Sequence, residues 1–331
     1  MNDLLAGILN GINSVVHNYG WSIVIFTLLI KVVLLPFDYK SRKSMRRMSK
    51  LQPEIAKLQK KYANDKDKLN QKTSELYRKE KINPISGCVP MLITLPVLFA
   101  MFGAMRYIAN MELAKQALDM LATSQPVNEG WLWVKNLWMP DAPFAVAIAD
   151  QGSLLQIPAD VWASVWNSLE SLDLPKLGLL KDLGLSLEGL NGQAVFDLLS
   201  KDPIYQEELA AWAAMPSLNL IFTQLTIYAK CNGFFILPIL ASVTQFLMTA
   251  TQPQPATAPT ADGKTPGTGK FMKYFFPLFS LYICAGYNAG FSLYWVMANI
   301  IAWVQGIVLN KVFEAHDQRT AQVTIGEGTV K

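Results

Sequence analysis

One lysine stands well inside a long apolar stretch, where it could attract a negatively charged group. The stretch is WSIVIFTLLIKVVLLPF, residues 21–37, and the lysine is Lys31. An apolar run of about 20 residues can cross a bilayer, and a cation within such a span is costly enough to require a reason. Thr27 lies four residues earlier, and therefore on the same helix face. A hydroxyl and an ammonium group that face one way inside a membrane predict a water-filled groove.

The ammonium group of Lys31 is expected to have no acidic partner, because none of the predicted spans contains Asp or Glu. The alternative is that the side chain snorkels to the membrane edge near Phe37, about 9 Å away along a helix. We favour the groove, with Lys31 as its unpaired positive charge.

Two further apolar stretches each carry a single polar stripe at helical spacing. The stripes are Ser242, Gln245 and Thr249 in one stretch, and Ser292, Trp295 and Asn299 in the other. Polar side chains inside membranes commonly hydrogen-bond to neighbouring helices, and that alternative stays open for these positions. With Thr27 and Lys31, these six residues are the candidate lining of a substrate groove.

Other kinds of site find little support in the sequence. Hydrophobic residues make up 51% of the 331 residues and charged residues 16%, whereas about 25% charged is usual in soluble domains. Two distant histidines (His17 and His316) and three cysteines predict neither a metal site nor a disulfide framework. The segment GKTPGTGK is not a phosphate-binding loop, because Lys264 and Phe271 replace the required Gly and Ser/Thr. We therefore expect no cofactor and no enzymatic activity.

The chain is expected to be an all-α polytopic membrane protein with a five-helix transmembrane core. Residues 1–20 would form an amphipathic extracytoplasmic segment, although a loose leader fits them equally well. Residues 1–30 contain no Lys or Arg, so the first span is expected to be retained rather than cleaved as a signal peptide. The other predicted parts follow in order: spans 21–37, 84–108, 231–250, 271–287 and 289–312, with a cytoplasmic hairpin 38–83, an extracytoplasmic region 109–230, a linker 251–270 and a tail 313–331.

Charge predicts the orientation of these spans. Residues 38–83 hold fifteen Lys/Arg against six Asp/Glu, whereas residues 109–220 hold five Lys against fourteen Asp/Glu. The positive-inside rule places the first segment in the cytoplasm and the second outside, which puts the N-terminus outside and the tail inside. The basic segment would suit nucleic acid, but retention in the cytoplasm explains its charge without such a partner. The same charges could meet ribosomes, a Sec translocon or lipid head groups.

Two regions have features that the charge pattern does not explain. Pro90 and Pro96 stand inside the second predicted span, where each should kink the helix. The outer region is rich in tryptophan, with short amphipathic segments such as 160–172. Its tryptophans would either rest at the membrane interface or fill the core of a small helical domain.

Several stretches together resemble the YidC membrane-protein insertase family, which includes related mitochondrial and chloroplast insertases. The stretches are TLLIKVVLLPFDYKSRKSM, LQPEIAKLQKKYANDKDKL, YRKEKINPISGCVPMLITLPVLFAMF, LWMPD, ILPILASVTQFL and GFSLYWVMANIIAWVQ. They cover residues 20–110, 131–144 and 231–313, in the order of the family. The most specific is the NP-x-x-GC-x-P signature formed by Asn83, Pro84, Gly87, Cys88 and Pro90.

The resemblance implies five core spans around a groove that opens to the cytoplasm. Lys31 stands where a groove arginine is typical of the family, and it keeps the charge but not the planar fork for bidentate pairing. Thr94 replaces a common Gln, and Asn288-Ala289 replaces a Pro-Ser pair. Residues 145–228 are an insertion that the family pattern does not explain.

These observations predict an insertase and chaperone for membrane proteins, located in a bacterial plasma membrane. Its partners would be nascent membrane-protein clients and lipids, with no nucleic-acid specificity. One alternative is a small-anion transporter or channel that uses the same groove, although no internal repeat supports it. Another is a structural anchor for ribosomes, which would make Lys31 dispensable.

Overall fold

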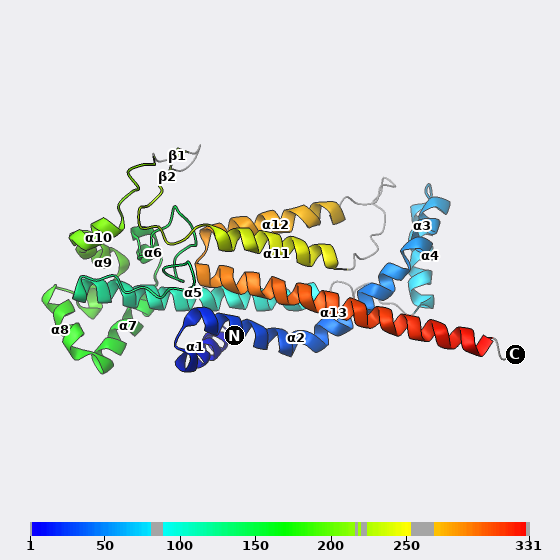
Figure 1. Ribbon diagram of the computed structural model, residues 1–331, viewed down its shortest axis with the longest axis horizontal. Coiled ribbons are helices and arrows are strands. Elements are labelled where there is room, and N and C mark those ends of the chain that lie inside the picture. The colour runs from blue at the N-terminus through cyan, green and yellow to red at the C-terminus, as the bar shows by residue number, and fades with distance from the viewer. Residues whose placement is uncertain (1, 81–88, 216–217, 220–223, 253–267, 329–331) are drawn as a thin grey trace. The chain divides into compact units, whose positions relative to one another are not determined.

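The computed structural model describes residues 2–80, 89–215, 218–219, 224–252 and 268–328 (Figure 1). A two-stranded antiparallel sheet pairs Leu218 with Leu225. The residues of the NP-x-x-GC signature from 83 to 88, and most of the linker 251–270, lie outside the described residues. The elements are α1 (Asn2–Val16), α2 (Tyr19–Lys50), α3 (Gln52–Lys61), α4 (Lys66–Lys79), α5 (Val89–Thr123), α6 (Gln151–Leu155), α7 (Ala159–Leu172), α8 (Leu174–Asp182), the 3-10 helix η2 (Leu187–Gly189), α9 (Gly192–Leu199), α10 (Pro203–Glu208), β1 (Leu218–Asn219), β2 (Gln224–Leu225), α11 (Ile236–Thr251), α12 (Thr268–Gly286) and α13 (Ala289–Gly328).

Long apolar helices make this an all-α membrane protein, as the sequence predicts. Among the described residues, three helical segments are long and apolar enough to cross a membrane: Tyr19–Lys50, Pro96–Thr123 and Ala289–Arg319. The apolar helix α11 is shorter. The expected number of five spans stays a prediction.

Several helices continue beyond the predicted ends of the spans. The first helix does not end at Pro36, because α2 runs through this proline to Lys50. A proline inside a helix removes one hydrogen bond and need not end the helix. Likewise, α5 extends to Thr123 and α13 to Gly328, well past the apolar residues.

The chain divides into two compact units, and α2, α5, α11, α12 and α13 each contribute residues to both. The first unit comprises Met1–Phe26, Phe99–Ala241 and Ser280–Val296. The second comprises Thr27–Leu98, Ser242–Phe279 and Met297–Lys331.

Buried hydrogen bonds in the first unit join the loop 136–141 to the segment 232–237. Asn232 is fully buried, and its side-chain amide donates hydrogen bonds to the backbone carbonyls of Asn136, Met139 and Pro140 at 2.9–3.0 Å. The fully buried Asp141 accepts bonds from the backbone N–H groups of Phe234 and Leu237. An acidic oxygen at these positions satisfies N–H groups that would otherwise be unpaired at the start of α11.

The N-terminal segment forms a helix that packs against the start of α2 within this unit. Leu5 and Leu9 are buried, while Leu4, Ile8 and Val15 are exposed, and a role for α1 as an amphipathic extracytoplasmic segment stays a prediction. Polar contacts attach α1 to α2, since Tyr19 Oη donates to Asn10 Oδ1 at 3.0 Å and Ser22 Oγ donates to Asn13 Oδ1 at 3.2 Å. The segment therefore has a fixed position in this unit rather than that of a loose leader.

Most of the insertion 145–228 packs as small helices in the first unit. Trp162 and Trp166 of α7 are buried, which favours the helical-domain interpretation for these two residues, whereas Trp212 is exposed. The predicted apolar face of 160–172 does not continue to its end, because Leu172 is 86% exposed. Lys176 of α8 forms a 2.8 Å ion pair with Asp119 of α5.

The second unit contains the basic hairpin, in which α3 and α4 lie side by side (Figure 1). The contact between the two helices is narrow, with Ile55 and Leu69 buried among charged residues. Asp65 caps α4 by accepting a hydrogen bond from Lys68 N at 3.0 Å. The first arm breaks at Leu51, where Pro53 suits the first turn of a new helix.

Candidate functional site

Lys31 lies on the side of α2 that faces the rest of the second unit. Thr27, one turn before it, is fully buried, and Lys31 itself is partly buried. By contrast, Val32 and Val33 are 58% and 67% exposed, so they form the outer side of the helix. Leu28 and Leu35, about one turn before and after Lys31, are 52% and 38% exposed, so the lysine lies at the edge of the buried side of α2.

Lys31 has an acidic neighbour on α2, Asp38, beyond the end of the predicted span, although no salt bridge joins the two in the described part of the chain. Asp38 interacts electrostatically with Lys31, and Arg42 interacts with both. Because α2 continues through Pro36, Asp38 lies seven residues beyond Lys31 on one continuous helix, and therefore on nearly the same face. Within the described part of the chain, Lys31 makes no salt bridge or hydrogen bond, so the interaction with Asp38 acts at longer range.

Arg42 is a functional candidate that the sequence did not identify. It is only 8% exposed, and its Nη2 donates a hydrogen bond to the carbonyl of Ala302 in α13 at 3.1 Å. Gly306 makes room for the guanidinium, because a Cβ atom there would lie 2.9 Å from Arg42 Nη1. Continuing the helical spacing past Pro36 would have found Arg42, which lies four residues after Asp38.

One turn further along α2, a second arginine also contacts α13. Arg46 donates to the carbonyl of Asn310 at 3.2 Å and forms an ion pair with Asp317 at 3.1 Å. Lys50 also pairs with Asp317, at 2.7 Å. The C-terminal half of α2 is thus attached to α13 at several positions within the second unit.

The predicted stripe on α11 is partly buried. Gln245 is 8% exposed, and Ser242 and Thr249 are of intermediate exposure. Thr249 Oγ1 donates to the Gln245 carbonyl at 2.8 Å, and Gln245 Nε2 lies 3.5 Å from Thr249 Oγ1. These bonds lie within one helix.

The stripe on α13 is divided between the two units. Asn299 lies in the second unit, where its Nδ2 is 3.4 Å from Thr244 Oγ1 of α11. Ser292 lies in the first unit and donates to the Cys284 carbonyl at 3.2 Å, so it takes the helix–helix role that the sequence left open. Trp295, also in the first unit, packs with Phe291 at a ring-centroid distance of 5.5 Å.

The two candidate kink residues differ in their positions in α5. Pro96 lies inside the helix, whereas Pro90 lies in its first described turn. Because residues 81–88 lie outside the described part of the chain, kinks at Pro90 and Pro96 both stay predictions.

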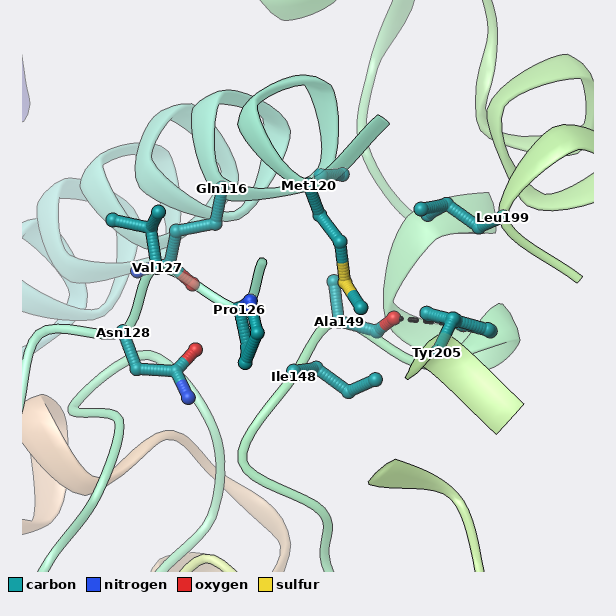
Figure 2. Close-up of a pocket in the computed structure, with 10 residues that line it drawn as sticks. Gln116, Met120, Pro126, Val127, Asn128, Ile148, Ala149, Leu199 and Tyr205 are labelled. Carbon is teal, nitrogen blue, oxygen red and sulfur yellow. Dashed lines mark hydrogen bonds between the residues drawn. The ribbon is translucent and has the colours of Figure 1, made fainter. Parts of the chain in front are cut away.

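A separate small pocket in the first unit lies between the end of α5 and the insertion (Figure 2). Tyr205 closes one side of it and donates a hydrogen bond to the Ala149 carbonyl at 2.9 Å. The lining residues include no Lys, Arg, Asp, Glu or His. In the described ranges, no cluster of three or more His, Cys, Asp or Glu residues could hold a metal ion. The pocket therefore offers no charged group for catalysis or ligand binding.

Comparison with known proteins links most of the chain to one family. A family model described as "60Kd inner membrane protein" matches residues 11–317. A protein named "Membrane protein insertase YidC" from Fusobacterium nucleatum subsp. nucleatum is 54% identical over 106 residues, which are 32% of this chain and 52% of that protein.

Two other relatives with the same name are similar over comparable stretches. The protein of Anaeromyxobacter dehalogenans (strain 2CP-C) is 38% identical over 142 residues, which are 43% of this chain and 23% of that protein. The protein of Coxiella burnetii (strain Dugway 5J108-111) is 50% identical over 99 residues, which are 30% of this chain and 18% of that protein. The chain thus spans about half of the Fusobacterium protein and less than a quarter of the other two.

Proposed function

The chain belongs to the 60Kd inner membrane protein family, and from this membership we propose that it inserts hydrophobic segments of other proteins into the membrane. The relatives named membrane protein insertase support this function. In this proposal the protein acts as an insertase and chaperone and makes or breaks no covalent bond.

The observation that carries the proposal is the position of Lys31, a partly buried cation on the inner side of an apolar helix. A charge at this depth is costly unless water or an opposite charge meets it. The same unit also holds polar side chains on α11 and α13, namely Gln245 and Asn299. We infer a groove that opens to the cytoplasm and carries the positive charge of Lys31.

An incoming segment would use this groove in two steps. An acidic tail is drawn to Lys31, and the water in the groove shortens the apolar layer that the tail must cross. The membrane potential adds about 2.3 kcal/mol per charge per 100 mV for a negative tail that moves outward. The apolar segment then leaves sideways into lipid, whose favourable contact with apolar surface supplies the driving force.

The outer face of α12 offers a surface for this sideways exit. Tyr274, Phe275, Leu278 and Phe279 are between 39% and 65% exposed on this helix. Large aromatic and aliphatic side chains suit transient contact with many apolar sequences. In the proposal, the basic hairpin of α3 and α4 faces the cytoplasm, where it would meet ribosomes, a Sec translocon or lipid head groups.

Complementation of a bacterium depleted of its own insertase tests the proposal. We expect the wild-type chain and Lys31→Arg to restore growth, Lys31→Ala to restore it weakly, and Lys31→Glu to fail. Equal rescue by Lys31→Glu would show that the groove charge is not needed. Removal of residues 52–79, which form α3 and α4, separates the role of the hairpin from that of the groove. If only this deletion abolished rescue, the chain would be a ribosome anchor instead.

A further inference from the structure

Three charged residues share one face of α2 in the second unit. Lys31 and Asp38 are seven residues apart, and Asp38 and Arg42 are four residues apart, which corresponds to about two turns and one turn. Asp38 interacts electrostatically with both cations. None of the salt bridges between described residues joins two of the three, so Lys31 is not engaged in a salt bridge with Asp38.

Contacts with α13 hold the Arg42 side chain in place, so it cannot easily move relative to Asp38. Its Nη2 is hydrogen-bonded to the Ala302 carbonyl, and its Nη1 lies against the Cα side of Gly306. Nη1 is buried and has no hydrogen-bond partner among the residues that the structure describes. A guanidinium buried with one nitrogen unpaired gains from a nearby negative charge, and Asp38 supplies one.

Asp38 therefore lies between two cations. Arg42 is held in place by α13, whereas Lys31 can still attract the acidic group of a client. Its carboxylate is the same chemical group as the acidic tail of a client. Any attraction that Asp38 exerts on Lys31 lowers the attraction that Lys31 can offer to a client. Arg42 also attracts the Asp38 carboxylate, from the other side along α2. This attraction limits how strongly Asp38 competes for Lys31.

We propose that Asp38 is a specificity-determining residue, a resident carboxylate that competes with the acidic groups of clients for Lys31, with Arg42 limiting that competition. The inference rests on the proposed insertase function and deepens it. It implies that clients with strongly acidic tails overcome the attraction between Asp38 and Lys31 more readily than clients with weakly acidic or neutral tails. It also implies that removing the charge of Asp38 and removing the charge of Arg42 have opposite effects.

The test uses the full chain reconstituted in vesicles and two single-span clients that differ only in the tail, one with two Asp and one with two Asn. The measured quantity is the ratio of acidic-tail to neutral-tail insertion. We expect Asp38→Asn to raise this ratio roughly three- to tenfold, the range for unit charges about 10 Å apart at a partly solvated site. Arg42→Gln should lower the ratio, and Asp38→Glu should keep it near the wild-type value.

Two comparisons separate this role from a merely structural one. In a Lys31→Ala background, Asp38→Asn should leave the ratio unchanged, because the competition requires Lys31. An unchanged ratio in the single variant Asp38→Asn, or an equal loss for both clients, would overturn the inference while leaving the insertase function intact. If the wild-type chain inserted neither client, the proposed function and the inference would both fall.

Discussion

At the scale of single residues, Glu129 should make the stability of the first unit depend on pH. Its Oε1 accepts a hydrogen bond from Tyr19 N at 2.7 Å. Burial raises the pKa of the Glu129 carboxyl above its usual range, the bond from Tyr19 lowers it, and the charge of Glu112 raises it further. The net direction is upward, so the folded chain holds this proton at pH values where the unfolded chain has lost it.

We predict that Glu129→Gln reduces the loss of stability on raising the pH. A carboxyl whose folded pKa is raised contributes its stability fully below the unfolded pKa, about 4.3. That contribution is lost as the pH rises through the folded pKa. Glutamine stays neutral and keeps an oxygen that can accept the bond from Tyr19, so the melting temperature should depend less on pH. Melting curves in detergent at several pH values measure this, with the exposed Glu188→Gln as control. Equal slopes for Glu129→Gln and the wild type would contradict the prediction.

The residues of the candidate site were only partly predictable. Lys31 and Thr27 could be found because a charge in an apolar run is unusual whatever the fold. Asp38 could not, because the apolar run ends at Phe37 and Asp38 is the first residue of the segment predicted to lie in the cytoplasm. The role of Gly306 depends on Arg42, which is distant in the sequence, so no local pattern could reveal it.

At the scale of elements, close packing of α6 against α9 depends on one glycine. A Cβ atom on Gly192 would collide with the backbone carbonyl of Leu154, which cannot turn aside as a side-chain end could. Both residues belong to the insertion in the first unit. The contact is therefore a sensitive test of whether the small helices of the insertion pack as described.

We predict that Gly192→Ala lowers the free energy of unfolding of the first unit by about 1–3 kcal/mol, the usual cost of overpacking. Gly178→Ala on α8 is the matched control, because its added methyl group would meet nothing within 4 Å. This control should be neutral or slightly stabilising, since alanine favours helix over glycine by up to about 1 kcal/mol. Denaturant unfolding followed by tryptophan fluorescence measures both variants. Similar values for the two alanines would show that α6 and α9 do not pack closely.

The helices themselves were largely predictable, and their ends were not. Apolar runs and helical periodicity indicated α2, α5 and α13, since burial in protein or lipid requires such patterns. Their polar extensions lack that signal, because a helix outside the membrane is stabilised by contacts such as Arg46 with Asp317. The packing of the insertion depends on contacts between distant residues, for example Lys176 with Asp119.

At the scale of the whole molecule, charge is the feature that bears on orientation. Residues 38–83 carry a large excess of Lys and Arg, and residues 109–220 carry a large excess of Asp and Glu. Moving the basic segment across the membrane would oppose both the membrane potential and the anionic inner surface. The basic hairpin should therefore lie in the cytoplasm and the acidic insertion outside.

Labelling of single cysteines tests this orientation directly. Starting from a chain in which Cys88, Cys231 and Cys284 are replaced by Ser, one cysteine is placed at the exposed Asn64 of the hairpin or the exposed Gln193 of the insertion. In intact spheroplasts, a membrane-impermeant maleimide should label Gln193→Cys and spare Asn64→Cys. After lysis both should react, which controls for accessibility. Labelling of Asn64→Cys before lysis would reverse the predicted orientation, and it would also place the opening of the Lys31 groove on the wrong side of the membrane for clients arriving from the cytoplasm.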